Sequence, residues 1–166
     1  MRWFGILAVL LLAGCGATDS SAQDPKTIVL DSYQKFEEQG VTETLTNQEG
    51  VWTLVFDPTR PDYQAGWFDE SGKGELIFET DYFSVFVAYL MLSDRDLETK
   101  LTDNGFSMQS ENWSKIDFVV KKGLIVGASS EEFDPWSTTI EYEVSTELRD
   151  RLIELEADLI ESFSDS

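Results

Sequence analysis

The chain has 166 residues, of which 42% are hydrophobic, and its 11 Phe and 5 Trp can fill the core of one domain of ordinary size. Its 32 acidic and 12 basic residues give a formal net charge of −20, which makes nucleic acid and anionic membrane surfaces poor partners. The absence of His and the single Cys exclude a Ser-His-Asp triad, a Cys-His pair, a His-ligated zinc site and an intrachain disulfide. Carboxylate, Lys or Tyr chemistry and oxygen-ligated cations remain open, and we assign no catalytic set, no metal and no cofactor.

A hydrophobic run at residues 3–13 follows the amino terminus and Arg2. It is too short to cross a bilayer as a helix, which takes roughly 20 apolar residues, and it has the layout of an export signal. Its end, Leu12-Ala13-Gly14-Cys15, resembles the lipobox of bacterial lipoproteins. The resemblance implies cleavage before Cys15 and attachment of a diacylglyceryl group to its sulfur, with acylation such as palmitate on the new amine. The alternative is an ordinary secretory signal with a chance Cys.

The resemblance covers only the first sixteen residues. Residues 16–26 (GATDSSAQDPK) are small and polar without periodicity, which is typical of a flexible tether with a reach of roughly 15 to 20 Å. We therefore expect a signal peptide at 1–14, a lipidated tether at 15–26 and a single globular domain at 27–166.

Apolar residues at helical spacing, followed by Gly40, predict an amphipathic helix over residues 27–39. The apolar positions are Val29, Tyr33 and Phe36. Residues 41–50 are mostly polar and predict a loop or a frayed turn.

The β-branched and aromatic run at 51–56 predicts a strand that stops at Asp57-Pro58. A second strand is expected at 75–79. The segment between them, 57–74, is rich in Gly and Pro and is therefore expected to be a long loop, a type of segment that often carries function.

Residues 82–92 (YFSVFVAYLML) are the most hydrophobic part of the chain beyond the signal. Their aromatic and β-branched content favours a central strand buried on both faces, although periodicity alone also allows a buried helix. Ser93 or Asp94 is expected to cap a short helix that carries Leu97 and Leu101 and ends at Asn104-Gly105.

Alternating residues at 113–120, a Lys121-Lys122-Gly123 turn and a return at 124–128 predict a β-hairpin. After a loop at 129–137, the alternation at 138–144 predicts a half-exposed antiparallel strand. The inward positions of this last strand are expected to be Ile140, Tyr142 and Val144.

A final helix is predicted to begin at Ser145 or Thr146, because leucines recur on one face and Glu147 stands in the favourable first turn. The stripe consists of Leu148, Leu152, Leu155, Leu159 and Phe163. It is too short for a coiled coil, so we expect it to pack on the sheet of its own chain.

These elements predict one α+β domain, in which an antiparallel sheet of about five or six strands carries the N- and C-terminal helices on one face. The alternative is a layered α/β arrangement in which 82–92 pairs in parallel with a neighbouring strand.

The loop at 57–74 groups carboxylates with two aromatic residues: Asp57, Asp62, Asp69, Glu70, Trp67 and Phe68. Two of the carboxylates could act as the acid and base of a glycosidase. A calcium loop over 69–80 is disfavoured, because Lys73 takes a ligand position and Thr80 replaces the closing Glu. The simplest interpretation is an ordinary acidic loop.

The loop at 129–137 places Phe133 and Trp136 beside Asp134 and two further carboxylates. Aromatic rings next to carboxylates suit sugar stacking or contact with a cationic peptide, so Phe133, Asp134 and Trp136 are candidate ligand contacts. The competing interpretation is that Trp136 folds back as a lid on the edge of the sheet.

The sequence thus favours a bacterial lipoprotein on the extracytoplasmic face of a membrane, held by Cys15, with a non-enzymatic domain that binds a ligand or a partner in the cell envelope. The expected partners are an envelope protein or polysaccharide, and the membrane only through the lipid. One alternative is a carboxylate-dependent hydrolase of envelope polysaccharide. Another is a structural subunit of an envelope complex.

Overall fold

The computed structural model describes residues 23–60, 65–132 and 134–164, so the predicted signal peptide and Cys15 lie outside the described residues. The helices are α1 (Pro25–Gln39), α2 (Ser84–Met91) and α3 (Thr146–Ser164). The strands are β1 (Val41–Asn47), β2 (Gly50–Phe56), β3 (Ala65–Asp69), β4 (Gly74–Ile77), β5 (Glu98–Thr102), β6 (Gly105–Gln109), β7 (Ile116–Lys121), β8 (Leu124–Ser130) and β9 (Trp136–Glu141).

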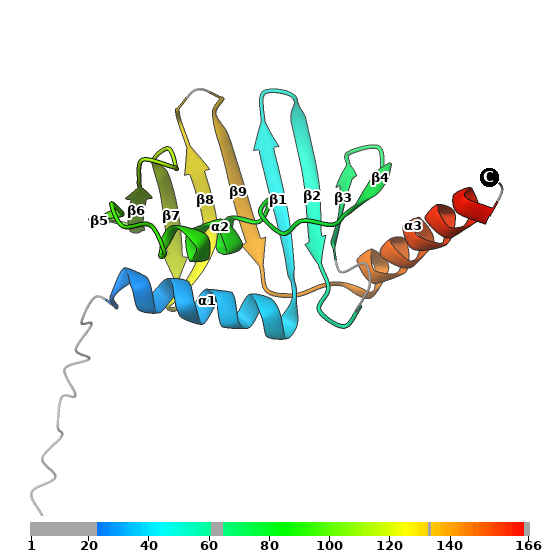
Figure 1. Ribbon diagram of the computed structural model, residues 1–166, viewed down its shortest axis with the longest axis horizontal. Coiled ribbons are helices and arrows are strands. Elements are labelled where there is room, and N and C mark those ends of the chain that lie inside the picture. The colour runs from blue at the N-terminus through cyan, green and yellow to red at the C-terminus, as the bar shows by residue number, and fades with distance from the viewer. Residues whose placement is uncertain (1–22, 61–64, 133, 165–166) are drawn as a thin grey trace, which may run out of the picture.

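Within the described residues, the strands form one open antiparallel sheet in the order β4-β3-β2-β1-β9-β8-β7-β6-β5, with the helices outside it (Figure 1). The fold class is therefore α+β, as the sequence predicts. Two meanders, β1 to β4 and β5 to β9, meet where β1 pairs with β9, and α2 lies between them in the sequence. The sheet has nine strands rather than five or six.

Helices α1 and α2 pack on one face of the sheet, across its lower half in Figure 1. Helix α1 begins with Pro25, whose missing N–H is no loss in the first turn, and its buried side chains include Val29 and Phe36. Ser32 fixes α1 to β8, because its hydroxyl oxygen accepts a hydrogen bond from the backbone N–H of Ile125 at 3.0 Å. The main core of the protein lies between these helices and the sheet.

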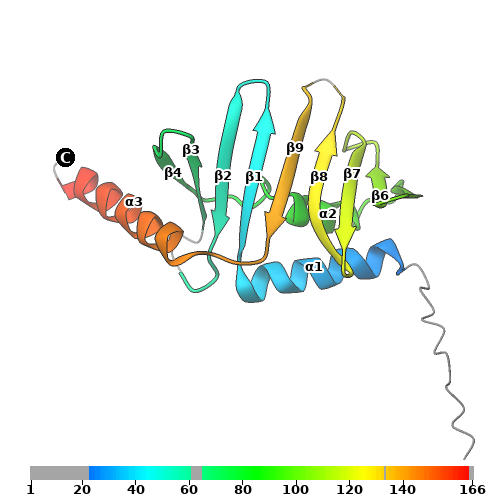
Figure 2. The ribbon, with the colours of Figure 1, turned by 180° about the vertical axis from the view of Figure 1, so that it is seen from behind.

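Helix α3 packs on the opposite face, where Leu152 joins a second cluster with Val55, Phe68 and Val144. Val55 alternates with Leu54, which belongs to the main core, and alternate residues of a strand point to opposite faces. The expectation of both terminal helices on one face is therefore wrong. Figure 2 shows the reason: the chain leaves β9 and passes across the lower ends of β1 and β2 before α3 begins.

Several segments predicted as loop or helix are strands. Residues 41–47 form β1, and the expected loop at 57–74 contains β3. The helix expected after Ser93 is instead a hairpin of β5 and β6 that turns at 103–104. Strands β3, β5 and β6 have five residues each and give weak β signals, while the seven residues of β1 pair along their length with β2 and β9.

The hydrophobic segment predicted as a central strand forms helix α2 instead. Val85, Ala88 and Met91 are fully buried in the main core, at spacings of three that place them on one side of a helix. The segment is apolar at nearly every position because α2 packs against both α1 and the sheet, so its sequence shows no amphipathic period.

The C-terminal half follows the sequence prediction more closely. The hairpin of β7 and β8 turns at Lys122 and Gly123, both with positive φ, and α3 begins at Thr146. Val144 lies beyond the end of β9 and packs with α3, so the prediction that it shares the inward face with Ile140 is wrong. Among the described residues, no helix is both long and apolar enough to cross a membrane.

Candidate functional site

Two cavities of about 470 and 460 Å³ lie on the sheet face that carries α1 and α2. Leu45 and Tyr82 line both cavities, so the two adjoin. The first is lined by β1 to β4 and the segment after β4, and the second is lined in part by Ser84 and Val87 of α2. Together they form a continuous depression across the centre of the sheet.

Every tryptophan that the structure describes lines one of these cavities: Trp52 and Trp67 the first, Trp113 and Trp136 the second. All are half-buried. We call the depression the aromatic groove, and define it by Leu45, Trp52, Trp67, Tyr82, Trp113 and Trp136.

The register of the central strands sets one part of the groove. Leu45 on β1 pairs with Trp52 on β2 and with Thr138 on β9, and directly paired residues in an antiparallel sheet share a face. Trp67 on β3 pairs with Leu54, which faces the same side as Trp52. Side chains from four adjacent strands therefore make one surface.

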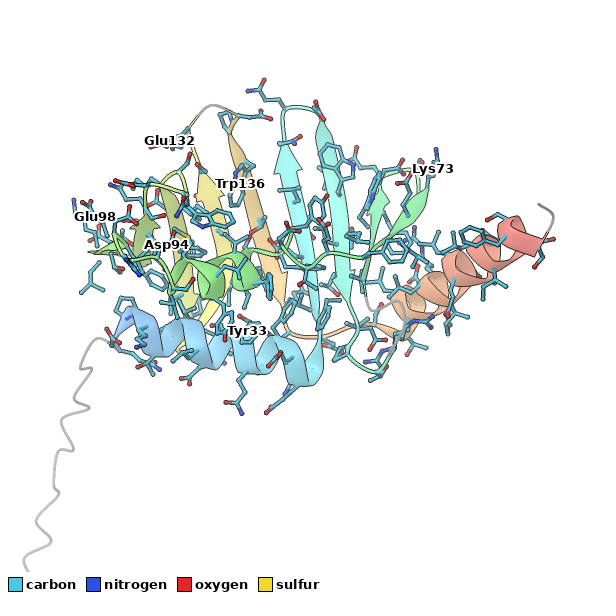
Figure 3. All side chains as sticks on the ribbon, viewed as in Figure 1. Tyr33, Lys73, Asp94, Glu98, Glu132 and Trp136 are labelled. Atoms are coloured by element: carbon cyan, nitrogen blue, oxygen red, sulfur yellow. The ribbon has the colours of Figure 1, made fainter. Side chains whose placement is uncertain are left out.

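Trp136 is the first residue of β9, where it pairs with Asn47 of β1 and Ser130 of β8. Figure 3 shows its ring on the α2 side of the sheet. Trp113 comes from the loop between β6 and β7, which is tied to Asp94 after α2 through the Ser110 hydroxyl at 2.6 Å. These two rings approach the groove from different elements.

Residues 78–83 connect β4 to α2 by crossing the face of the sheet in front of β3, β2 and β1 (Figure 1). Tyr82 belongs to this crossing segment and reaches both cavities. Asp81 lies beside it and lines the second cavity. The segment therefore forms one boundary of the groove.

A buried polar cluster lies beneath the second cavity. The Glu43 carboxylate on β1 accepts hydrogen bonds from the Ser84 backbone N–H, at 3.0 Å, and from the Ser84 hydroxyl. The Ser84 and Thr138 hydroxyl oxygens lie 3.2 Å apart, and both residues line the cavity. Burial raises the pKa of Glu43 to about 7, while the hydrogen bonds from Ser84 oppose the shift.

A hydroxyl beside a carboxylate could act as a nucleophile and its base. The geometry here instead fits a structural contact that joins β1 to the start of α2. Ser84 is the first residue of α2, and a carboxylate at that position satisfies a helix N–H that has no partner within the helix. Glu43 is only 1% exposed and does not itself line either cavity. We therefore assign Glu43 to the positioning of α2.

Of the residues predicted as ligand contacts, Asp134 and Trp136 both line the second cavity. The side chain of Phe133 lies outside the described residues. The lid interpretation places Trp136 at the edge of the sheet, but Trp136 begins the central strand β9, where its half-buried ring packs against the main core and lines the second cavity.

The residues singled out in the 57–74 loop do not form one site. Asp57 is buried and accepts a hydrogen bond from Arg149 of α3 at 3.0 Å, while Asp69 accepts bonds from Ser71 and Lys73 in its own turn. The hydrogen bond from the Ser71 hydroxyl is the main cause of a lowered pKa at Asp69. Phe68 faces α3, and Asp62 lies outside the described residues.

The sequence singles out Trp67 only as an aromatic of the 57–74 loop, and it does not point to Trp52, Tyr82 and Trp113 as parts of a site. The available signal was the alternation of the strands, which puts Trp52 and Trp67 on the inner faces of β2 and β3 once both strands are recognised. Trp113 and Tyr82 lie on connections, whose positions depend on the tertiary fold.

Comparison with models of known protein families, with curated proteins and with solved structures finds no match to this chain. The functional argument therefore depends on the sequence and on the geometry of the aromatic groove.

Proposed function

We propose that this protein is a bacterial lipoprotein of the extracytoplasmic membrane face, whose folded domain binds a ligand in the aromatic groove without catalysing a reaction. The Leu12-Ala13-Gly14-Cys15 motif supports lipid attachment at Cys15. The observation that carries the binding role is the convergence of four tryptophans, from β2, β3, β9 and the β6–β7 loop, on two adjoining cavities.

The size and lining of the groove support recognition of a ligand. Each cavity falls within the range of about 300 to 1,000 Å³ that is usual for ligand sites. A half-exposed tryptophan keeps a large apolar area in contact with water, which is unfavourable. Exposed aromatic patches therefore mark interaction surfaces. Asn47 and Asn112 line the second cavity and provide amides that orient a polar ligand.

A polysaccharide hydrolase would use two carboxylates that face each other across the bound substrate. Asp57 and Asp69, two of the carboxylates considered for that chemistry, hold α3 and a turn in place. Neither lines the groove cavities. These contacts remove Asp57 and Asp69 as an acid and base for a substrate in the groove.

Anchoring is tested by expressing Cys15→Ser in a bacterial host and separating membranes from soluble protein. We expect the variant to leave the membrane fraction, because the acyl chains supply nearly all of the affinity and the acidic domain supplies none. Ser20→Ala, a substitution in the same tether, should stay with the membrane. Retention of Cys15→Ser in the membrane pellet would contradict the proposed anchor.

Binding is tested with the full chain immobilised in nonionic detergent and exposed to solubilised cell envelope. The comparison is between the wild type and Trp52→Leu/Trp136→Leu, which keeps apolar bulk but removes two flat rings and their N–H groups. Phe163→Ala is the control, since this aromatic on α3 is 74% exposed and outside the groove. A component captured by the wild type and the control, but not by the double variant, is the expected result. Equal capture by all three would exclude the groove as the binding site.

A further inference from the structure

The charged residues that line the aromatic groove all have one sign. Glu75 and Glu79 line the first cavity, Asp81 and Asp134 line the second, and no Lys or Arg lines either one. These carboxylates come from β4, from the crossing segment and from the loop before β9. The fold therefore brings negative charge to the groove from three separate parts of the chain.

These carboxylates also lack partners. Within the described residues, Glu75, Glu79, Asp81 and Asp134 make no ion pair and their carboxylates accept no hydrogen bond. Among the described residues, Asp57, Asp117 and Glu156 are the carboxylates in ion pairs. The four groove carboxylates are exposed and leave a negative field beside the apolar lining of the groove, which salt can screen.

The tryptophans add a second preference for positive charge. The face of an indole ring carries negative charge density and attracts ammonium and guanidinium groups. In the described part of the chain, no indole N–H of the groove donates a hydrogen bond to a protein acceptor and no groove tryptophan stacks on another ring. The groove therefore offers free donors, free ring faces and free carboxylates.

We propose that the aromatic groove binds a basic peptide segment of a partner protein, an inference that rests on the binding function proposed above. Backbone carbonyls accept from the indole N–H groups, Lys or Arg side chains pair with the carboxylates and lie over the tryptophan faces, and apolar side chains enter the two cavities. A neutral sugar can stack on the rings and donate hydroxyl hydrogen bonds to the carboxylates, but it brings no positive charge to offset the four negative ones. An anionic polymer is repelled by them.

The test follows tryptophan emission, which reports on the groove because all the described tryptophans lie in it. The full chain carries Trp3→Phe, so no other tryptophan remains, and is held in nonionic detergent. The probe is a short capped peptide of alternating Lys and Leu without aromatic residues. The controls are the same peptide with Glu in place of Lys, and a neutral oligomer of N-acetylglucosamine.

We expect saturable binding of the Lys peptide only, weakening about tenfold or more as salt rises from about 50 to about 300 mM. Glu75→Gln/Asp81→Asn should weaken binding by about tenfold. Glu154→Gln/Glu161→Gln on α3 changes the net charge equally but lies outside the groove, and should leave binding almost unchanged.

Two results would overturn the proposal of a basic peptide. One is that the double substitution on α3 weakens binding of the Lys peptide as much as the double substitution in the groove does. Binding would then depend on net charge and not on the groove. The other is a saturable response to the neutral or the anionic probe but not to the Lys peptide, which would keep the groove as a binding site for another ligand class. Absence of any response, together with equal envelope capture by the Trp52→Leu/Trp136→Leu variant, would instead refute the proposed binding function itself.

Discussion

Glu43 in the centre of the sheet accepts hydrogen bonds from both the backbone N–H and the side-chain hydroxyl of Ser84, the first residue of α2. This contact joins β1 to α2, which packs against both α1 and the sheet. Because Ser84 and Thr138 line the second cavity, the same contact fixes the floor of the aromatic groove. The ionisation state of Glu43 therefore links pH to the stability of this region.

Replacing Glu43 with Gln should change how stability depends on pH. The folded-state pKa of Glu43, about 7, is higher than its ordinary value of 4.5, so between these pH values the folded chain keeps a proton that the unfolded chain has lost. This group therefore makes the wild type less stable as pH rises from about 4.5 to about 7, by roughly 3 kcal/mol. Gln does not titrate, so the stability of the variant should not show this fall between pH 4.5 and 7.

The measurement is the free energy of unfolding in urea between pH 4.5 and 8 for wild type and Glu43→Gln. The contributions of the other carboxylates cancel in the difference between the two proteins. Glu141→Gln, at an exposed position on β9, is the control and should differ from wild type by a constant amount. A difference between Glu43→Gln and wild type that does not vary with pH would contradict the assignment.

Leu152→Ala should destabilise the protein by about 2 to 5 kcal/mol, because Leu152 is fully buried between α3 and the sheet and the substitution leaves a cavity there. Its neighbour Ile153 is 50% exposed, so Ile153→Ala should cost no more than about 0.5 to 1 kcal/mol. Urea unfolding of both variants tests this. Similar losses at the two positions would mean that α3 does not pack through Leu152.

Gly40→Ala should destabilise the protein more than Gly72→Ala. Both glycines have positive φ, 76° and 88°, so a side chain at either costs roughly 1 to 2 kcal/mol in backbone strain. Only at Gly40 does an added Cβ come within 2.4 Å of a backbone oxygen, that of Phe56, which α1 and β2 hold rigidly. At Gly72 the nearest atom, 3.5 Å away, is the end of the flexible Arg151 side chain.

Thermal unfolding of the two glycine variants measures the difference, which we expect to exceed about 1 kcal/mol, because overpacking beside a fixed backbone adds to the strain. An equal loss of stability in Gly40→Ala and Gly72→Ala would contradict this explanation. That result would mean that α1 can shift away from β2 without loss of packing.

The charge of the groove predicts an asymmetry in the quenching of tryptophan fluorescence, without any ligand. In the full chain with Trp3→Phe, caesium should quench more strongly than iodide, relative to free tryptophan, because the four carboxylates attract the cation and exclude the anion. The asymmetry should shrink as salt shortens the screening length to about 10 Å at 0.1 M.

Glu75→Gln/Asp81→Asn should reduce the asymmetry of quenching, whereas Glu154→Gln/Glu161→Gln should preserve it. Equal quenching by the two ions in the wild type would show that the groove carries no effective negative field. It would also remove the electrostatic argument for a basic peptide.

Local sequence signals were sufficient where neighbouring residues alone decide the structure. The hairpin of β7 and β8 depends on a turn at Lys122-Gly123, where positive φ suits Gly, and α3 depends on a leucine period of three and four residues. Helix α1 is defined in the same way by its apolar spacing and by Gly40 at its end.

The sequence by itself determined these elements, the acidic charge and the absence of His chemistry. Tertiary structure decided that residues 84–91 form a helix, that residues 41–47 form a strand, and which residues line the groove. The segment at 84–91 is apolar at nearly every position, so no period distinguishes helix from strand, and only its packing against α1 and the sheet does so. A Glu in residues 41–47 argues locally for an exposed loop. Glu43 can be buried in β1 only because Ser84, far along the chain, donates hydrogen bonds to its carboxylate. The groove tryptophans are separated in sequence and meet because strands β1 and β9 pair across the centre of the sheet, a long-range contact that local pattern does not encode.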